Sequence, residues 1–154
     1  MARAFLTALA QAGKPLTKKQ LRARTGYAAS GPVSDTFALL TRERLVAPDG
    51  SGLALTGGGL DRLGPYDPLP TGQALRSGIL NGTIRDLSKM ERAFLEHLFE
   101  AWPNAVSKAE LRERAGYAAS GPVSDAFAHI VAIDYATKVG AGQLKAADEL
   151  FEEA

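Results

Sequence analysis

The chain of 154 residues contains no cysteine. This absence excludes disulfides and thiolate metal sites, and it fits a protein of the reducing cytoplasm, which is the location we expect. The sequence also lacks an apolar run of about 18 residues, so it predicts no membrane-spanning helix. The formal net charge is only +1, so the chain as a whole is not a polycation.

Side chains suited to catalysis are equally scarce. The only histidines are His97 and His129, and they fall in different predicted helices. The glycines at 57–59 lack the Gly-Lys-Ser/Thr ending of a phosphate-binding loop. No spacing typical of metal ligands occurs. By these criteria we expect no enzyme, no metal site and no cofactor.

What the chain does contain is a ten-residue stretch that occurs twice. Residues 26–35 (GYAASGPVSD) recur unchanged at 116–125, an offset of 90 positions. The similarity continues on both sides, since Leu21 returns as Leu111. Self-similarity at a fixed offset indicates one structural unit used twice. Two copies predict a tandem pair of small domains.

Helix signals surround the first copy of this stretch. Thr17 and Gln20 fit a capping box, in which each side chain bonds a backbone N–H at the start of a helix. Gly26 stands where the C-cap of that helix favours a positive φ. Ser30 or Gly31 can cap the helix that follows. The pattern predicts two helices joined by a tight turn, which is either a helix-turn-helix unit or a corner that only packs.

The flanking sequence predicts the rest of a winged helix, because Asp49-Gly50 between two apolar runs is a hairpin signal. In this arrangement the helix after the turn enters the DNA major groove and the hairpin is the wing. For the first copy we expect helices at 2–12, 17–25 and 32–44, strands at 45–47 and 53–55, and a short helix at 57–63. For the second copy we expect helices at 89–101, 108–114 and 122–134, then a shorter wing, with Phe151 folded back on the core.

The predicted fold is therefore mainly α with short β-hairpin wings, as two tandem winged-helix domains. We place the first domain at residues 1–64, a Pro-rich connector with room for one packed helix at 65–87, and the second domain at 88–154. Their net charges are +5, zero and −4. Such asymmetry affects the choice of partner more than the fold.

In the first copy, side chains that suit phosphates or base edges gather around the turn. The predicted DNA-contacting residues are Lys14, Lys18, Lys19, Arg22, Arg24, Ser34, Thr36, Thr41, Arg42 and Arg44. Lys and Arg neutralise phosphates and release counterions, whereas Ser and Thr can bond several bases. Two plainer interpretations stay open. The cations can form a solvated face, and Ser34 and Asp35 can simply favour the dipole in the first turn of their helix.

The third helix of the second copy has a different character. It contains no Lys or Arg, and it carries more apolar side chains than one buried stripe needs. An exposed apolar surplus is typical of a protein interface. The predicted interface residues are His129, Ile130, Val131, Ile133 and Tyr135. They would pack against a second subunit, as in a homodimer, against the first domain, or against another protein partner.

The pattern Gly-Tyr-x-x-x-Ser-Gly, followed by an apolar helix and a Gly-rich hairpin, resembles a tandem winged-helix segment. Such segments occur in phage and mobile-element proteins of bacteria and in the tails of some bacterial ATP-binding proteins. Residues 68–75, 89–95 and 146–151 also look like parts of that segment. The relatives tend to carry Arg in the middle of the third helix, where this chain has Leu39 and Thr41.

Together these features predict a cytoplasmic DNA-binding regulator or accessory protein, encoded by a phage or mobile element. The first domain would contact duplex DNA, and the second would mediate dimerisation or partner binding. A two-fold pair would place two recognition helices on successive major grooves. The alternative is a protein-interaction module or inhibitor that uses the winged-helix shape without binding DNA.

Overall fold

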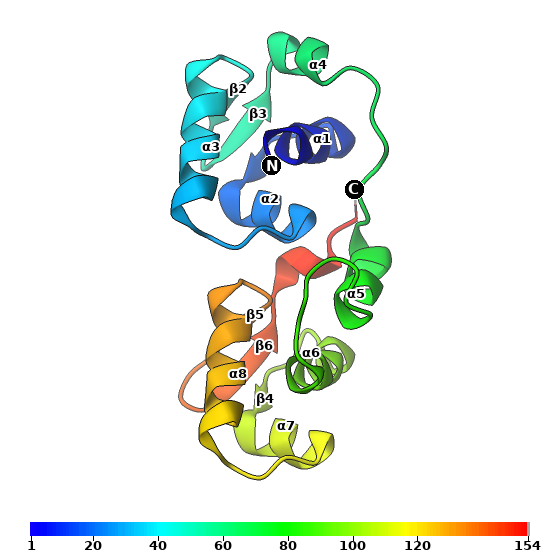
Figure 1. The fold of residues 1–154 in the computed structure, drawn as a ribbon, viewed down its shortest axis with the longest axis vertical. Helices are drawn as coiled ribbons and strands as arrows, with labels where there is room; N and C mark the ends of the chain where they lie inside the picture. Colours follow the sequence, from blue (N-terminus) through cyan, green and yellow to red (C-terminus); the bar gives the residue numbers. More distant parts are fainter. Residues whose placement is uncertain (154) are drawn as a thin grey trace. The chain divides into compact units, whose positions relative to one another are not determined.

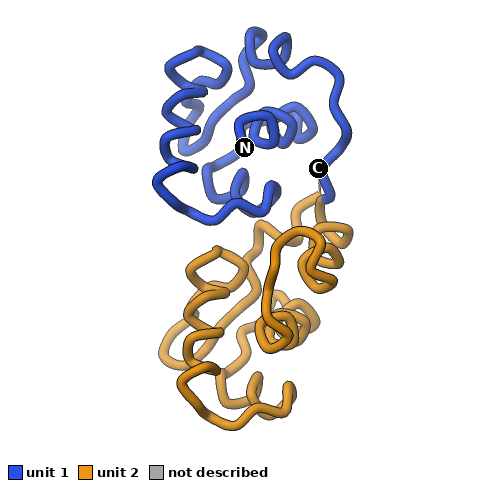
Figure 2. Tube along the Cα trace, in the orientation of Figure 1, with its two compact units in different colours: residues 1–70, 154 blue, residues 71–153 orange. Residues whose placement is uncertain are grey.

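The computed structural model describes residues 1–153, which divide into two compact units (Figure 2). The first unit comprises residues 1–70 and the second residues 71–153. These residues are mainly helical and form two small antiparallel sheets of three strands, one in each unit. The coarse prediction of helices with short hairpins is confirmed. None of the helices in residues 1–153 is both long and apolar enough to cross a lipid bilayer.

The elements of the first unit follow the predicted order (Figure 1). They are α1 (Ala2–Ala12), β1 (Leu16–Thr17), α2 (Lys18–Thr25), α3 (Gly31–Arg42), β2 (Val46–Asp49), β3 (Gly52–Leu55) and α4 (Gly57–Leu63). The sequence did not predict β1, because a strand of two residues is too short to show a period. It pairs with β3, so the sheet order is β1-β3-β2.

The predicted capping signals act as expected in the first unit. The Thr17 hydroxyl accepts from the backbone N–H of Gln20, and the Gln20 side chain accepts from the N–H of Thr17. Gly26 ends α2 with a φ of 80°, a value that costs other residues energy. Ser30 caps α3 by accepting from the Val33 N–H at 3.3 Å. Local side chains therefore fix where both helices begin and how the turn between them is made.

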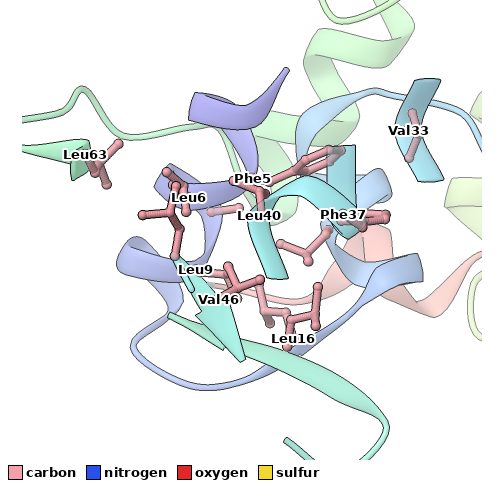
Figure 3. Packing of buried hydrophobic residues seen from close by; sticks show 13 residues of the cluster. Phe5, Leu6, Leu9, Leu16, Val33, Phe37, Leu40, Val46 and Leu63 are labelled. Carbon is pink, nitrogen blue, oxygen red and sulfur yellow. The ribbon is translucent and has the colours of Figure 1, made fainter. Parts of the chain in front are cut away.

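Aromatic packing holds α1 against the two helices of the turn (Figure 3). Phe5 is fully buried, and its ring centroid lies 4.5 Å from that of Phe37 and 5.8 Å from that of Tyr27. Figure 3 shows Phe5 and Phe37 together with leucines from α1 and α3 and with Val46 from β2. This cluster fixes the orientation of α3, because the buried side of α3 is anchored through Phe37.

The second unit repeats the same run of helix, strand, helix, helix and two strands, and adds an element at each end (Figure 1). Its elements are α5 (Gly72–Leu80), α6 (Lys89–Ala101), β4 (Val106–Ser107), α7 (Lys108–Ala115), α8 (Gly121–Ala132), β5 (Ala136–Lys138), β6 (Gln143–Ala146) and the 3₁₀ helix η1 (Asp148–Phe151). Phe94 lies 4.4 Å from Phe127 and 5.8 Å from Tyr117, between ring centroids. The aromatic core is thus the same in both units.

The predicted connector at 65–87 is not a free linker along its length. Residues 71–87 belong to the second unit, where α5 packs against α6 and η1. Leu75 and Ile79 of α5 are fully buried. The helix that the sequence left room for is therefore part of the second core, and the boundary between the units falls after Pro70.

The chain end folds back as predicted. Phe151 stacks on Trp102 with ring centroids 4.1 Å apart, and the Arg76 guanidinium lies 4.2 Å from the Phe151 ring centroid. Arg76 also donates to the Leu150 carbonyl at 3.0 Å, and Trp102 donates to Asp148 at 2.9 Å. These contacts tie η1 to α5 and to the end of α6.

Replacing Phe151 by alanine should lower the free energy of unfolding by about 2 kcal/mol, somewhat less than for a fully buried phenylalanine, because Phe151 is half-buried. Trp102 is the only tryptophan of the chain, so its emission should shift to the red as the stacked ring is removed. Urea titration followed by Trp102 fluorescence measures both effects. Val139→Ala, at a 41% exposed position of the same unit, is the control and should change stability by less than about 0.5 kcal/mol.

Candidate nucleic-acid interface

A concavity of about 590 Å³ lies beside α3 in the first unit. We call it the α3 groove. Its lining residues come from the start of α2, from α3 and from the hairpin β2–β3: Lys18, Ser34, Phe37, Ala38, Thr41, Arg42, Pro48, Gly50, Ser51, Gly52 and Leu53. Four of the ten residues predicted to contact DNA are therefore brought together in one place.

Local sequence explains why these four side chains converge. Lys18 is the first residue after the cap Thr17, and its ammonium lies 5.7 Å from the ring centroid of Phe37, a cation–π contact. Thr41 and Arg42 follow Ser34 by seven and eight residues, about two helical turns, so all three lie toward one side of α3. The Thr41 hydroxyl donates to the Phe37 carbonyl at 3.0 Å and keeps its lone pairs for an outside donor.

The hairpin forms the opposite wall of the α3 groove. Its turn uses Gly50 with a φ of 60°, which fits the Asp-Gly signal in the sequence. The hairpin residues 46–55 contain no Lys or Arg. Every cation that lines the groove is therefore on a helix, and the hairpin contributes small side chains and backbone groups. Sequence reasoning had not placed Pro48 or Ser51 in the site, since only the paired strands bring them opposite α3.

Other predicted contacts lie away from the α3 groove. Lys14 lines a separate hollow with Asp49, at the end of α1. Arg44 is exposed just past the end of α3, in a left-handed conformation with a φ of 59°. The Thr36 hydroxyl donates to the Pro32 carbonyl at 2.8 Å and also lies 3.1 Å from the sulfur of Met1. None of these three residues lines the α3 groove.

The predicted DNA contact by Arg24 is wrong. Arg24 is only 3% exposed and has an interaction partner within the chain. It follows the buried Leu21 by three residues, so both lie on the inner face of α2. Helical spacing alone could have shown this. Lys19 and Arg22 are half-buried, and each also has a partner within the chain.

The equivalent positions of the second unit carry different chemistry. Lys108 lies 5.8 Å from the Phe127 ring centroid, close to the 5.7 Å between Lys18 and the Phe37 ring centroid. Val131 and Ala132 stand where the first unit has Thr41 and Arg42. The second unit therefore keeps the buried phenylalanine and one lysine, but it lacks the hydroxyl of Thr41 and the guanidinium of Arg42.

The predicted apolar interface on α8 is largely wrong. Ile130, Ile133 and Tyr135 are 0%, 6% and 1% exposed, respectively, so they are core residues of the second unit. The Tyr135 N–H donates to the Ile130 carbonyl at 3.0 Å, and burial raises the pKa of the Tyr135 phenol. Ile130 and Tyr135 correspond to Leu40 and Leu45 of the first unit, which are also buried, so these two positions belong to the core in both units. Only Val131, half-buried, and His129, exposed, stay accessible.

A polar contact that the sequence did not reveal joins α6 to α8. The Glu91 carboxylate meets His129 Nδ1, and its other oxygen accepts from the Ser88 N–H at 3.0 Å. Burial by itself would raise the pKa of Glu91, but the hydrogen bonds from His129 and Ser88 outweigh it and hold that pKa below its usual value. Within residues 1–153, no cluster of three or more His, Asp or Glu side chains could hold a metal ion.

The lowered pKa of Glu91 predicts acid sensitivity. The stability that the carboxylate contributes is present above its usual pKa of 4.5 and is lost as the pH falls through the lower folded value. Glu91→Gln should cost about 1–2 kcal/mol at neutral pH, and its stability should then fall less on acidification than that of the parent. Urea midpoints measured from about pH 7 to pH 3 test this. Glu96→Gln, at an exposed position of α6, should behave like the parent.

Comparisons with protein-family models, with curated proteins and with solved structures find no match to this chain.

Proposed function

We propose that both units are winged helices and that the first binds duplex DNA, with α3 in the major groove and the hairpin β2–β3 as the wing. The order helix, strand, helix, helix, hairpin, with a sheet in the order β1-β3-β2, supports this fold. A helix that follows a tight turn and presents a long exposed side is suited to the major groove. In α3 that side includes Ser34, Asp35, Ala38 and Arg42.

The observation that carries the proposal is the α3 groove. It joins Lys18 and Arg42, both exposed, with two hydroxyl side chains beside the outer side of α3. Lys18 and Arg42 would bind phosphates on the two sides of the DNA major groove. Ser34 and Thr41 would bind phosphate or base edges. Residues 1–70 carry a net charge of +4, whereas residues 71–153 carry −3, which favours the first unit as the one that meets DNA.

Salt-dependent binding to a fluorescently labelled duplex tests this function. The full chain should bind at low salt, and the logarithm of the association constant should fall linearly with the logarithm of salt concentration. Two to four phosphate contacts predict a slope of about −2 to −4. Absence of binding at low salt, or binding that salt does not weaken, would contradict the proposal.

One observation favours a second function, as a protein-interaction module. A hollow of about 370 Å³ lies between α1, α3 and α4. Its lining is mainly apolar but includes Arg3, Glu43 and Arg62, and its lining residue Leu39 is 36% exposed. A side chain of that kind on the outer surface of α3 suits a protein partner better than a phosphate backbone. Under this function the chain would not shift duplex DNA, and a co-purifying protein would be lost on Leu39→Asp but kept on Lys18→Ala.

A further inference from the structure

Asp35 is a carboxylate in an unexpected place. It is exposed on the outer side of α3, between Ser34 and the groove residue Ala38, and Arg42 follows two turns later on the same side. If α3 enters a major groove, this negative charge is brought close to phosphates, which repel it. A residue that opposes binding in this way needs a physical reason.

A structural role in α3 does not supply that reason. Ser30 caps the helix, and its hydroxyl accepts from the Val33 N–H. The first turn of α3 contains no acidic residue, because Asp35 lies beyond it. The favourable effect of a carboxylate on the helix dipole is confined to that turn. Asp35 also has no ion-pair partner among the described side chains. The interpretation of Asp35 as a first-turn residue is therefore wrong.

We propose that Asp35 is a specificity-determining residue that accepts a hydrogen bond from the N4 amino group of a cytosine in the major groove. This inference rests on the proposed function of the first unit. Guanine presents two acceptors in the major groove, and thymine presents O4 and a methyl group. Adenine presents a donor next to the N7 acceptor, which repels a carboxylate. Cytosine is thus the one base whose own major-groove edge offers a donor and no acceptor.

The neighbours of Asp35 fit this role. A carboxylate on so short a side chain reaches a base edge only when the helix backbone comes close to it. Gly31, one turn earlier, and Ala38, almost one turn later, are exposed and small, so they leave room for that approach. Lys18 and Arg42 would fix the register of α3 through phosphates, and Asp35 would then supply the discrimination between bases. On a non-cognate duplex the same carboxylate faces an acceptor, so binding weakens.

The chain contains a matched control for this residue. Asp125 occupies the same position of the identical ten-residue stretch in α8, and Ser120 caps α8 through the Val123 N–H at 3.3 Å, as Ser30 caps α3. The helix start and cap around the carboxylate are therefore the same in both units, although the residue one turn later is Leu39 in α3 and His129 in α8. Asp35 is adjacent in sequence to Ser34, which lines a groove that carries both Lys18 and Arg42, whereas the second unit has Ala132 in place of Arg42.

The test is selection of bound sequences from a duplex library with a random core, using the full chain and the variants Asp35→Asn, Asp35→Ala and Asp125→Asn. The parent should enrich a C·G pair at one position. Asp35→Asn should change that position to A·T, because an Asn amide pairs with N6 and N7 of adenine. Asp35→Ala should reduce the preference at that position by about fivefold or more and should bind random duplex more tightly than the parent. Asp125→Asn should match the parent.

The outcomes separate the two proposals. If the parent binds duplex DNA and the Asp35 variants keep its base preference, the inference is overturned while the proposed function stands. An equal change in Asp125→Asn overturns it too, because the effect then belongs to the helix and not to the base contact. If the parent and all variants fail to bind the library, the proposed function itself is overturned. Since Asp35 and Asp125 are both exposed, far-UV circular dichroism and urea midpoints should be unchanged in every variant.

Discussion

Replacing Lys18 and Arg42 together by alanine should weaken binding of the full chain to duplex DNA by about 30-fold or more at low salt. A hydrogen bond to a charged group contributes roughly 1.5–3 kcal/mol, so about 30-fold is a lower bound for the loss of two. The two side chains are the only cations that line the α3 groove in the described first unit. The slope of affinity against salt should also fall by about 2, because two phosphate contacts are lost. Titration of a labelled duplex at several salt concentrations measures both quantities.

The second unit supplies the control for this double variant. Lys108 has the same place after a helix cap and the same cation–π contact with a buried phenylalanine as Lys18. The second unit has Ala132 in place of Arg42, so Lys108 does not belong to a DNA-binding groove under this proposal. Lys108→Ala should then leave the affinity for duplex DNA and its salt slope unchanged. If it lowers affinity as much as Lys18→Ala does, the binding is a diffuse charge effect and the α3 groove is not the site. Lys18 and Arg42 are exposed, so the free energy of unfolding of the double variant, measured by urea titration, should differ from that of the parent by less than about 0.5 kcal/mol per site.

Replacing Phe5 by alanine should have the largest effect on stability, a loss of about 3–5 kcal/mol. Phe5 is fully buried and contacts the rings of both Phe37 and Tyr27. A loss of this size is a large fraction of the stability of a small domain, which is about 5–15 kcal/mol. DNA binding should be lost with it, because α3 is anchored through Phe37.

Urea titration by circular dichroism measures this effect, and Phe94→Ala tests the same contact in the second unit. Phe94 has the same two aromatic partners, so a loss of similar size is expected, and Trp102 at the end of α6 should report it by fluorescence. Leu60→Ala, at a 52% exposed position, is the control for the first unit and should change stability by less than about 0.5 kcal/mol. A loss below about 1 kcal/mol for Phe5→Ala would contradict the central role given to this ring.

Sequence by itself determined where most elements begin and end. Thr17 with Gln20, Gly26 and Ser30 are local signals, and each forms the cap or turn that its residue type predicts. The Asp49-Gly50 pair marked the hairpin in the same way. Such signals can be recognised without the rest of the chain because they depend on hydrogen bonds and dihedral angles within a few residues. The duplication was visible for a simpler reason, since identical residues stand 90 positions apart.

Only the tertiary structure decided which side chains are available for function. The α8 pattern showed an apolar surplus, but Ile130, Ile133 and Tyr135 are all buried within the second unit. Lys18 and Arg42 are 24 positions apart, and they line the same groove only because Phe37 anchors α3 beside the start of α2. Helical periodicity tells which residues share a face. How many elements cover that face, and which distant side chains lie next to it, depend on contacts between segments that no local pattern contains.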